Sequence, residues 1–180
     1  MMRNLWHDLP VGPQAPDLVN VIVEIPGSTR NKYEFDHDGG YIKLDRVLAS
    51  PLHYPADYGL IPRTLYDDGD PLDILVLIKE PTFPGCVLVA RPIGLFRMLD
   101  QGLKDDKILA VAHNDPLYAE YSDLSDVPSH YLREVAHFFN RYKDLEGKRV
   151  ETLGWEPQEA AREQIQRAQQ RYLEHYPVAG

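Results

Sequence analysis

Four aspartates lie close together just before a short apolar run. They are Asp67, Asp68, Asp70 and Asp73. Carboxylates about 5 Å apart repel one another by roughly 3 kcal/mol per pair at an effective dielectric constant near 20, so they either fan out into water or share a cation. Gly69 and Pro71 indicate a shaped loop at the mouth of a buried strand, which favours the cation. Ligand sets made only of oxygen select hard ions such as Mg²⁺ or Mn²⁺.

The spacing of these aspartates does not fit an EF-hand. If Asp68 is the first loop position, the fifth, sixth and twelfth positions hold Leu72, Asp73 and Lys79, where an oxygen ligand, a glycine and a glutamate are needed. A solvated acidic turn is the alternative interpretation. The stiffening proline and the direct step from Asp73 into apolar residues favour a cation site over that alternative.

Charged residues elsewhere could join this site. Asp105 and Lys107 are two residues apart and project to one face if their segment is extended, although alone they would suit an ordinary hairpin loop. Glu24 interrupts an apolar segment, and if its neighbours point outward it points inward. A carboxylate in such a place requires a cation or a proton.

A set of hydrogen-bond donors accompanies the acids. Lys32 and Glu34 alternate in one expected strand, and Arg46 ends another. Lysine, arginine and tyrosine side chains are suitable donors to phosphate oxygens. The further candidates are Tyr54, Tyr58, Tyr142 and Lys143. Any one of these could instead be an ordinary surface or core residue, but together they suggest a polar cavity.

Several common catalytic motifs are missing from the sequence. It has no phosphate-binding Gly-x-x-x-x-Gly-Lys-Ser/Thr loop, no Gly-x-Gly-x-x-Gly fingerprint and no Gly-x-Ser-x-Gly elbow. The seven histidines show no His-Glu-x-x-His spacing, which disfavours zinc. The chemistry therefore has to rest on carboxylates, metal ions and cationic side chains.

The composition indicates one globular protein. With 180 residues and 43% hydrophobic residues, a single domain over 1–180 can bury a core. The net charge of −9 disfavours a nucleic-acid partner. One cysteine, Cys86, fits a reducing compartment, and no apolar run reaches the length of a signal peptide or membrane span. We expect a cytoplasmic protein with no membrane partner.

The expected strands fill the first two-thirds of the chain. Their residue ranges are 18–25, 32–35, 41–47, 74–78, 87–98 and 107–113. The second and third form a hairpin around Asp38-Gly39-Gly40. Pro92 and Gly94 predict a bend or bulge in the long strand. Several short strands at regular spacing predict a closed or nearly closed barrel over about 18–115.

The last third, about 126–175, is expected to be helical. One helix begins near Pro128, ends near 144–147 and carries an apolar stripe of Leu132, Val135, Ala136 and Phe139. A second helix begins near Pro157 and carries the stripe Ala161, Ile165, Ala168 and Tyr172. Strands followed by helices predict an α+β domain, a barrel with two C-terminal helices packed beside it.

At this point the chain resembles the soluble inorganic pyrophosphatases of family I, in their bacterial form. The likeness covers roughly residues 18–155 and rests on an ordered set of segments. They are Val23-Glu24-Ile25-Pro26, Lys32-Tyr33-Glu34, Asp45-Arg46, Tyr54-Pro55-Ala56-Asp57-Tyr58-Gly59, Asp68-Gly69-Asp70-Pro71-Leu72-Asp73, Arg91-Pro92-Ile93-Gly94, Asp105-Asp106-Lys107 and His137-Phe138-Phe139-Asn140-Arg141-Tyr142-Lys143-Asp144.

The resemblance implies a five-stranded barrel of OB type and the hydrolysis of pyrophosphate to two phosphates by a metal-activated water. It implies several Mg²⁺ ions per site, with Mn²⁺ possible. It also implies roles for individual residues. The metal ligands are Asp68, Asp73, Asp105, Asp100 and Glu24, the catalytic residues are Asp70, as the base, and Tyr54, and the substrate-binding residues are Lys32, Glu34, Arg46, Tyr58, Lys107, Tyr142 and Lys143.

Two positions depart from the family pattern. Gln101 stands where many relatives have glutamate, which affects the outer metal site. Arg141 stands where some relatives have a histidine at a subunit contact. Bacterial relatives are commonly hexamers, so the resemblance implies a homohexamer, and Arg141 leaves its geometry and pH sensitivity open.

Three other functions stay open at this stage. A metal-dependent hydrolase of nucleotides or organic diphosphates would need an aromatic platform for the base, which the sequence does not reveal. An OB-type binding module for single-stranded nucleic acid would need a basic groove, which the charge of −9 disfavours. An inactive relative serving as a scaffold is the third, although every expected catalytic residue type is present.

Overall fold

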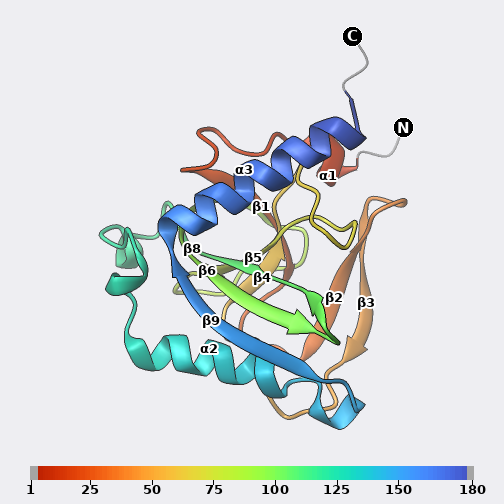
Figure 1. Cartoon of the computed structure of the whole chain (residues 1–180), viewed down its shortest axis with the longest axis vertical. Coiled ribbons are helices and arrows are strands. Elements are labelled where there is room, and N and C mark those ends of the chain that lie inside the picture. Colours follow the sequence, from red (N-terminus) through yellow and green to blue (C-terminus); the bar gives the residue numbers. More distant parts are fainter. Residues whose placement is uncertain (1–3, 178–180) are drawn as a thin grey trace.

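The computed structural model describes residues 4–177 and combines one large sheet with a separate hairpin and two long helices (Figure 1). The large sheet contains β1 (Val19–Ile25), β4 (Asp57–Leu60), β5 (Asp73–Leu77), β6 (Val87–Asp100), β7 (Leu103–Lys104), β8 (Lys107–Ala112) and β9 (Val150–Pro157). The hairpin is β2 (Asn31–Asp36) and β3 (Tyr41–Val47), and the helices are α1 (Leu5–Asp8), α2 (Ser129–Arg141) and α3 (Gln158–His175). This arrangement confirms the mixed α+β class.

Five strands follow one another around a ring. The pairings run β1–β4–β5–β8–β6 and return to β1, while β7 and β9 extend the sheet along β6. Every pair is antiparallel except β5 and β8, which run parallel. The register between β6 and β8 shifts between Pro92 and Gly94, which confirms the predicted bulge.

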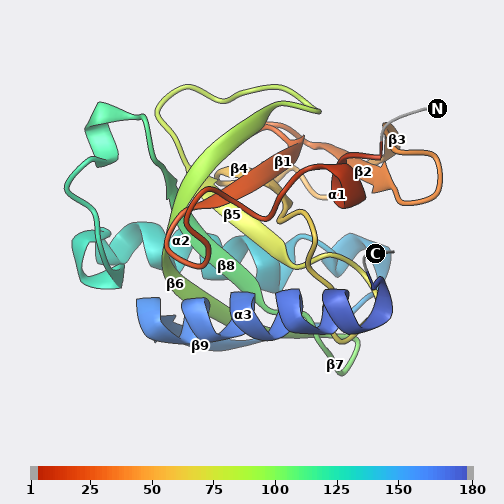
Figure 2. The same ribbon diagram turned by 90° about the horizontal axis from the view of Figure 1, so that it is seen from above.

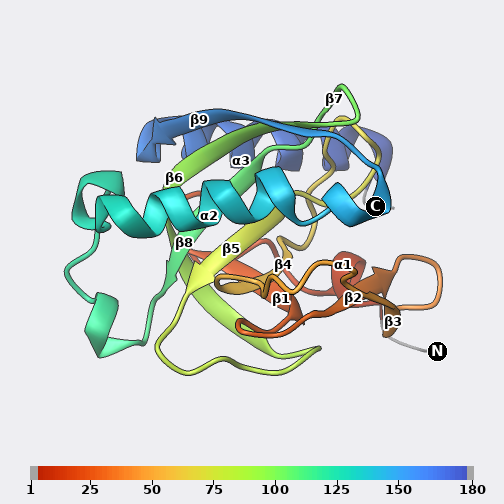
Figure 3. The same ribbon diagram turned by 90° about the horizontal axis from the view of Figure 1, so that it is seen from below.

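The two long helices cover opposite sides of the sheet, α3 in Figure 2 and α2 in Figure 3. The predicted stripe of α3, Ala161 to Tyr172, is fully buried. On α2, Val135, Phe138 and Phe139 are buried and Leu132 and Ala136 are partly buried against the same cluster. Periodicity therefore identified the buried face of both helices.

Two sequence predictions need correction in the C-terminal third. The segment 126–175 is not wholly helical, because β9 lies between α2 and α3 and pairs with β6. The alternation of apolar residues in β9 is interrupted by Gly154, at φ +118°, and the β6 side shifts register between Arg97 and Met98. The first helix also ends earlier than predicted, at Arg141, since Lys143 has left helical geometry (φ −101°, ψ 2°) before the 3-10 turn Asp144–Glu146.

The short strand β4 was not predicted either. It has four residues in a segment broken by prolines, so its pattern is too short to recognise. Asp57 opens it and is buried, and it accepts hydrogen bonds from the backbone N–H groups of Gly27 (2.8 Å) and Thr82 (3.0 Å). This aspartate therefore has a structural role, because it ties the segments of Gly27 and Thr82 to the start of β4.

The hairpin stands apart from the large sheet and carries part of the candidate site. β2 and β3 pair from Asn31↔Val47 to Asp36↔Tyr41, as predicted. The backbone N–H of Phe35 donates to the Glu24 carboxylate of β1 over 2.6 Å, which fixes the hairpin to the sheet. Within residues 4–177, no helix has the length and apolar character that crossing a membrane requires.

Candidate active site

A cavity of about 610 Å³ lies between the hairpin, one end of the strand ring and the end of α2. All of the site residues predicted from the sequence line it except Arg46. They are Glu24, Lys32, Glu34, Tyr54, Tyr58, Asp68, Asp70, Asp73, Asp100, Asp105, Lys107, Tyr142 and Lys143. We call it the catalytic cavity. Segments that are far apart in the chain thus converge on one place, which was the central structural expectation.

The parallel pair β5 and β8 explains why the two acidic segments meet. Asp73 opens β5 and Lys107 opens β8, and the two residues are direct partners across the ladder. Because parallel strands start at the same edge of a sheet, the loops that precede them arrive side by side. The loop before β5 brings Asp68 and Asp70, and the loop before β8 brings Asp105.

Lys107 lies at the centre of this edge. Its ammonium contacts the Asp73 carboxylate at 2.5 Å and also contacts the Asp105 carboxylate. Its side chain is only 3% exposed. Burial alone would lower the pKa of Lys107, but the charges of Asp73 and Asp105 reverse the direction and raise it above its usual range. The side chain is therefore a fixed positive charge between two metal-ligand candidates.

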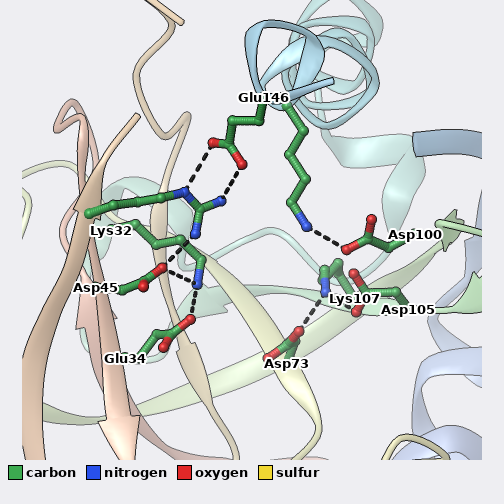
Figure 4. A network of polar contacts seen from close by, with 10 residues as sticks. Lys32, Glu34, Asp45, Asp73, Asp100, Asp105, Lys107 and Glu146 are labelled. Atoms are coloured by element: carbon green, nitrogen blue, oxygen red, sulfur yellow. Dashed lines mark hydrogen bonds and ion pairs between the residues drawn. The ribbon is translucent and has the colours of Figure 1, made fainter. Parts of the chain in front are cut away.

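The other cationic candidates are also held by carboxylates (Figure 4). Lys143 contacts Asp100, and Lys32 contacts Glu34 as well as Asp45 at 3.3 Å. These pairs lie partly buried around the catalytic cavity, with 11% and 19% exposure for the two lysine side chains. Each of the four cations predicted to bind substrate, Lys32, Arg46, Lys107 and Lys143, has a carboxylate partner in this structure.

Arg46 is the exception among the predicted residues, since it does not line the catalytic cavity. Its guanidinium makes a two-point contact with Glu146, at 3.0 Å from Nε and 2.9 Å from Nη2. It also contacts Asp45 at 2.5 Å. The contact with Glu146 links β3 to the 3-10 turn after α2 (Figure 4). Sequence reasoning missed Glu146, because nothing local marks a partner 100 residues away from Arg46.

Glu24 points inward, as predicted. The residue is 9% exposed. Burial and the nearby charge of Asp73 raise the pKa of Glu24 to about 8. Without a cation beside it, this carboxyl therefore keeps its proton over much of the neutral range.

The aspartates of the loop before β5 have raised pKa values too. Burial raises the pKa of Asp68, and Asp70 and Asp105 raise it further. Burial also raises the pKa of Asp70, which lies 3.4 Å from the ring nitrogen of His37 on the hairpin loop. His37 lines the cavity and was not predicted, because a single histidine in a turn carries no sequence signal.

Three tyrosines complete the wall and act as neutral donors. Burial raises the pKa of Tyr54, Tyr58 and Tyr142, so their hydroxyl groups stay protonated. Tyr54 packs on Phe138 (ring centroids 4.8 Å apart), and the Lys107 ammonium lies 5.7 Å from the centre of the Tyr58 ring. The rings support the cavity, and protonated tyrosine hydroxyl groups are suitable donors to phosphate oxygens.

The donor set fits a hard divalent cation. Its acids supply only oxygen ligands, and Oδ1 of Asp100 is buried with no hydrogen-bond partner among the described residues. Burial, with a smaller contribution from neighbouring carboxylates, raises the pKa of Glu24 and of Asp68, so a cation beside them would favour their charged forms. In residues 4–177 no group of three acidic, histidine or cysteine side chains lies close enough together to hold a metal as arranged here. Lysine ammonium groups occupy the space between the carboxylates instead.

Comparisons with known proteins agree with this geometry. The family model described as inorganic pyrophosphatase matches residues 21–173. An inorganic pyrophosphatase of Haloferax volcanii is 52% identical over 176 residues, covering 97% of this chain and 99% of the relative. Soluble inorganic pyrophosphatase 1 of Arabidopsis thaliana is 49% identical over 94% of this chain and 80% of its own. The crystal structure of the Thermus thermophilus inorganic pyrophosphatase superimposes with a TM-score of 0.91 at 44% identity, covering 94% of this chain and 99% of that one.

Proposed function

Because this chain belongs to the inorganic pyrophosphatase family and hydrolyses pyrophosphate to two phosphates, we propose that the catalytic cavity performs this reaction with Mg²⁺. One observation carries the proposal. The strands β5 and β8 run parallel and begin at the same edge of the sheet. This places carboxylates, which can bind metal ions, and cationic side chains, which can bind phosphate oxygens, in one cavity. A substrate with this much negative charge needs both kinds of group.

The proposed ligands of Mg²⁺ are Asp68, Asp73, Asp105, Asp100 and Glu24, which together suit several ions, and Mn²⁺ has the same ligand chemistry. When bound, such ions neutralise phosphate oxygens and lower the pKa of a water molecule. The unpartnered Asp100 oxygen and the buried Glu24 carboxyl are the strongest support, because each is costly without a cation.

The proposed substrate clamp is formed by Lys32, Arg46, Lys107, Tyr142 and Lys143, with Glu34 and Tyr58 at its margin. Their donors can exchange the present carboxylate partners for phosphate oxygens. Charge-assisted hydrogen bonds of this kind are roughly twice as strong as neutral ones. Tyr54, buried against Phe138, shapes the wall behind the reacting phosphate.

Asp70 is the proposed general base. It lies on the rim of the cavity, and its raised pKa makes it a better proton acceptor than an ordinary aspartate. Water attacks one phosphorus, Asp70 takes a proton from that water, and the bridging P–O bond breaks with the second phosphate as leaving group. No covalent enzyme intermediate is needed.

Phosphate release from pyrophosphate, with and without Mg²⁺, tests this proposal. Asp70→Asn should reduce turnover at least about 100-fold, as expected for loss of a general base, while calorimetry shows Mg²⁺ binding close to wild type. Wild-type turnover in the variant would remove Asp70 from its role. No release without Mg²⁺ is the expected control, and release at the full rate under chelation would contradict the metal requirement.

We further propose a single domain with an OB-type barrel, a homohexamer as the assembly and the cytoplasm as its location. The ring of five strands supports the barrel assignment. The exposed face of α2, which carries His137 and Arg141, supports self-association at that face. The single cysteine supports a reducing compartment. Light scattering of wild type and Arg141→Ala at several pH values tests the assembly, and a monomer at all of them would contradict it.

A further inference from the structure

Asp106 is a buried carboxylate that the proposed reaction does not use. Its neighbours Asp105 and Lys107 line the catalytic cavity and contact each other, whereas Asp106 between them does not line it. This agrees with an extended backbone, in which successive side chains point to opposite faces. Asp106 is 3% exposed. Because a buried charge is costly unless it is paired and hydrogen-bonded, its partners show what it holds together.

Three donors from two parts of the chain surround the Asp106 carboxylate. The Tyr66 hydroxyl donates to Oδ2 over 2.9 Å. Nη1 of Arg97 also donates to Oδ2, over 2.6 Å, and the backbone N–H of Met98 donates to Oδ1 over 3.3 Å. Arg97 and Met98 belong to β6, whereas Tyr66 precedes the loop that leads into β5. The carboxylate therefore joins β6 to the start of that loop.

Tyr66 also closes the loop of residues 67–70, which we call the aspartate loop. Its backbone N–H donates to the carbonyl oxygen of Asp70 over 2.7 Å, and its carbonyl oxygen accepts from the N–H of Gly69 over 3.2 Å. Tyr66 is 5% exposed, and burial together with the Asp106 carboxylate raises the pKa of its hydroxyl, which therefore stays a donor. One residue thus fixes the base of the aspartate loop and binds Asp106.

The segment of Asp105 is held at the same point. The backbone N–H of Asp105 donates to the carbonyl oxygen of Met98 over 3.0 Å, while the N–H of Met98 donates to the carboxylate of Asp106. Met98 is fully buried in β6. The aspartate loop, through Tyr66, and the segment of Asp105 are therefore fastened to one buried point.

Other contacts do less to fix these two segments. The ladder between β5 and β8 begins only after both of them, at Asp73 and Lys107. Asp67 of the aspartate loop contacts Arg171 of α3, but both side chains are 46% exposed, and such a contact contributes little. The buried carboxylate of Asp106 is the stronger link.

We propose, on the basis of the ligand roles proposed above, that Asp106 is a positioning residue for the metal site. Through Tyr66 and β6, its carboxylate holds the aspartate loop beside the segment of Asp105 before any ion binds. Carboxylates that face one cavity repel one another, so without such a link the two segments would spread apart. Replacing a residue that orients metal ligands typically weakens metal affinity about 10–100-fold.

Tyr66→Phe tests the link, because it removes one hydroxyl and leaves every charge and the buried ring in place. Calorimetry without substrate should show Mg²⁺ binding weakened about tenfold. In the loaded enzyme the carboxylates are also held from the side of the cavity, so kcat at saturating Mg²⁺ should stay within about twofold of wild type. A general loss of folding would lower affinity and kcat together.

Hydrogen exchange in EDTA gives a readout that needs no metal. Tyr66→Phe should speed the exchange of peptides covering 104–107 at least about threefold, although the substitution lies in another segment. The N–H of Asp105, which is bonded to β6, lies within these peptides.

Tyr172→Phe is the matched control. Tyr172 is also 5% exposed, and its hydroxyl pairs with Nδ1 of His7 at 2.7 Å, so the control likewise removes one buried hydroxyl that has a side-chain partner. It should keep the Mg²⁺ affinity of wild type and the exchange rate of wild type at 104–107.

A double-mutant cycle shows whether Tyr66 acts through Asp106. Arg97→Met/Asp106→Ala removes both charges of the pair, so neither is left buried alone. In that background the Tyr66 hydroxyl has lost its acceptor, and Tyr66→Phe should change Mg²⁺ affinity by less than about twofold. Urea unfolding checks that the background is folded, and if it is not, the single variant and its exchange rate decide the question.

The possible failures are distinguishable. If wild type binds Mg²⁺ and Tyr66→Phe binds it equally tightly, the positioning role is wrong, although the proposed ligands stand. If wild type binds no Mg²⁺, the ligand roles fail and the positioning role fails with them. An unchanged exchange rate at 104–107, or an undiminished effect of Tyr66→Phe in the background without Asp106, would show that Asp106 does not link the two segments.

Discussion

Replacing Glu24 by glutamine is expected to stabilise the metal-free protein, by an amount that increases with pH. Glu24 is 9% exposed, and its carboxylate accepts the Phe35 backbone N–H at 2.6 Å. Burial, with the charge of Asp73, raises its pKa from 4.5 to about 8. Glutamine has nearly the same volume and keeps an acceptor for Phe35, so the variant removes the ionisation and little else.

The direction and the size of this change in the free energy of unfolding follow from proton linkage. Between pH 4.5 and 8 the folded state keeps the Glu24 proton that the unfolded state has lost, so the stability present below the unfolded pKa is lost as pH rises through this window. Each pH unit in this window lowers the free energy of unfolding by about 1.4 kcal/mol. The wild type should therefore lose about 4 kcal/mol of unfolding free energy relative to the glutamine variant between about pH 5 and about pH 8. Other carboxylates titrate in both proteins and cancel in the comparison.

Urea unfolding in EDTA at several pH values measures this difference. Glu34→Gln is the matched control, because its side chain lies in the same cavity but is 42% exposed and paired with Lys32, so this variant should show no gain in the free energy of unfolding that grows with pH. Added Mg²⁺ should stabilise the wild type at pH 8 more than the Glu24 variant, since the ion favours the charged carboxylate. If the free energy of unfolding changed with pH in the same way for wild type and Glu24→Gln, the reasoning would be refuted. That result would show that Glu24 is a hydrated carboxylate of ordinary pKa.

Three further changes test other parts of the site. Asp105→Asn should weaken Mg²⁺ binding in calorimetry, and unaltered affinity would mean that it is no ligand. Glu146→Gln should lower the KM for pyrophosphate several-fold, because its charge competes with substrate for Arg46, whereas a raised KM would show that Glu146 holds Arg46 in place for binding. Arg97→Met should destabilise the fold by about 3–5 kcal/mol in urea, since it leaves the carboxylate of Asp106 buried and unpaired, and adding Asp106→Asn should recover much of the loss. A loss under about 1 kcal/mol would show that water reaches Asp106.

The parts of the fold that the sequence predicted are those with a local pattern. The apolar run at 74–78 anticipated β5, and the stripe from Ala161 to Tyr172 anticipated the buried face of α3. β4 and β9 were missed for a physical reason. β4 is held by pairing to β1 and β5 rather than by its own alternation, and β9 pairs with β6 across a register shift beside Gly154.

In the candidate site too, the sequence predicted what depends on a local pattern and missed what depends on long-range contacts. The sequence indicated which acids could gather, because carboxylates in a tight loop either spread into water or share a cation, and the structure brings them into one cavity. It did not indicate the partners that hold the cations. Glu146 lies 100 residues from Arg46, so only the folded chain brings the two together. Alternation along an extended segment separates Asp105 from Asp106, but it does not say which of them faces the catalytic cavity.

The pairing of lysines with carboxylates has a consequence for how the site fills. Lys107 is buried between Asp73 and Asp105, so it can turn to a phosphate oxygen only if other positive charge takes its place beside those carboxylates. The same holds for Lys143 and Asp100, whose second oxygen already lacks a partner. Each exchange keeps the buried charges paired, whereas substrate or metal alone would leave one set unpaired. Pyrophosphate and divalent cations should therefore bind with positive cooperativity, and a chain of net charge −9 can hold an anionic substrate because its acids and bases change partners together.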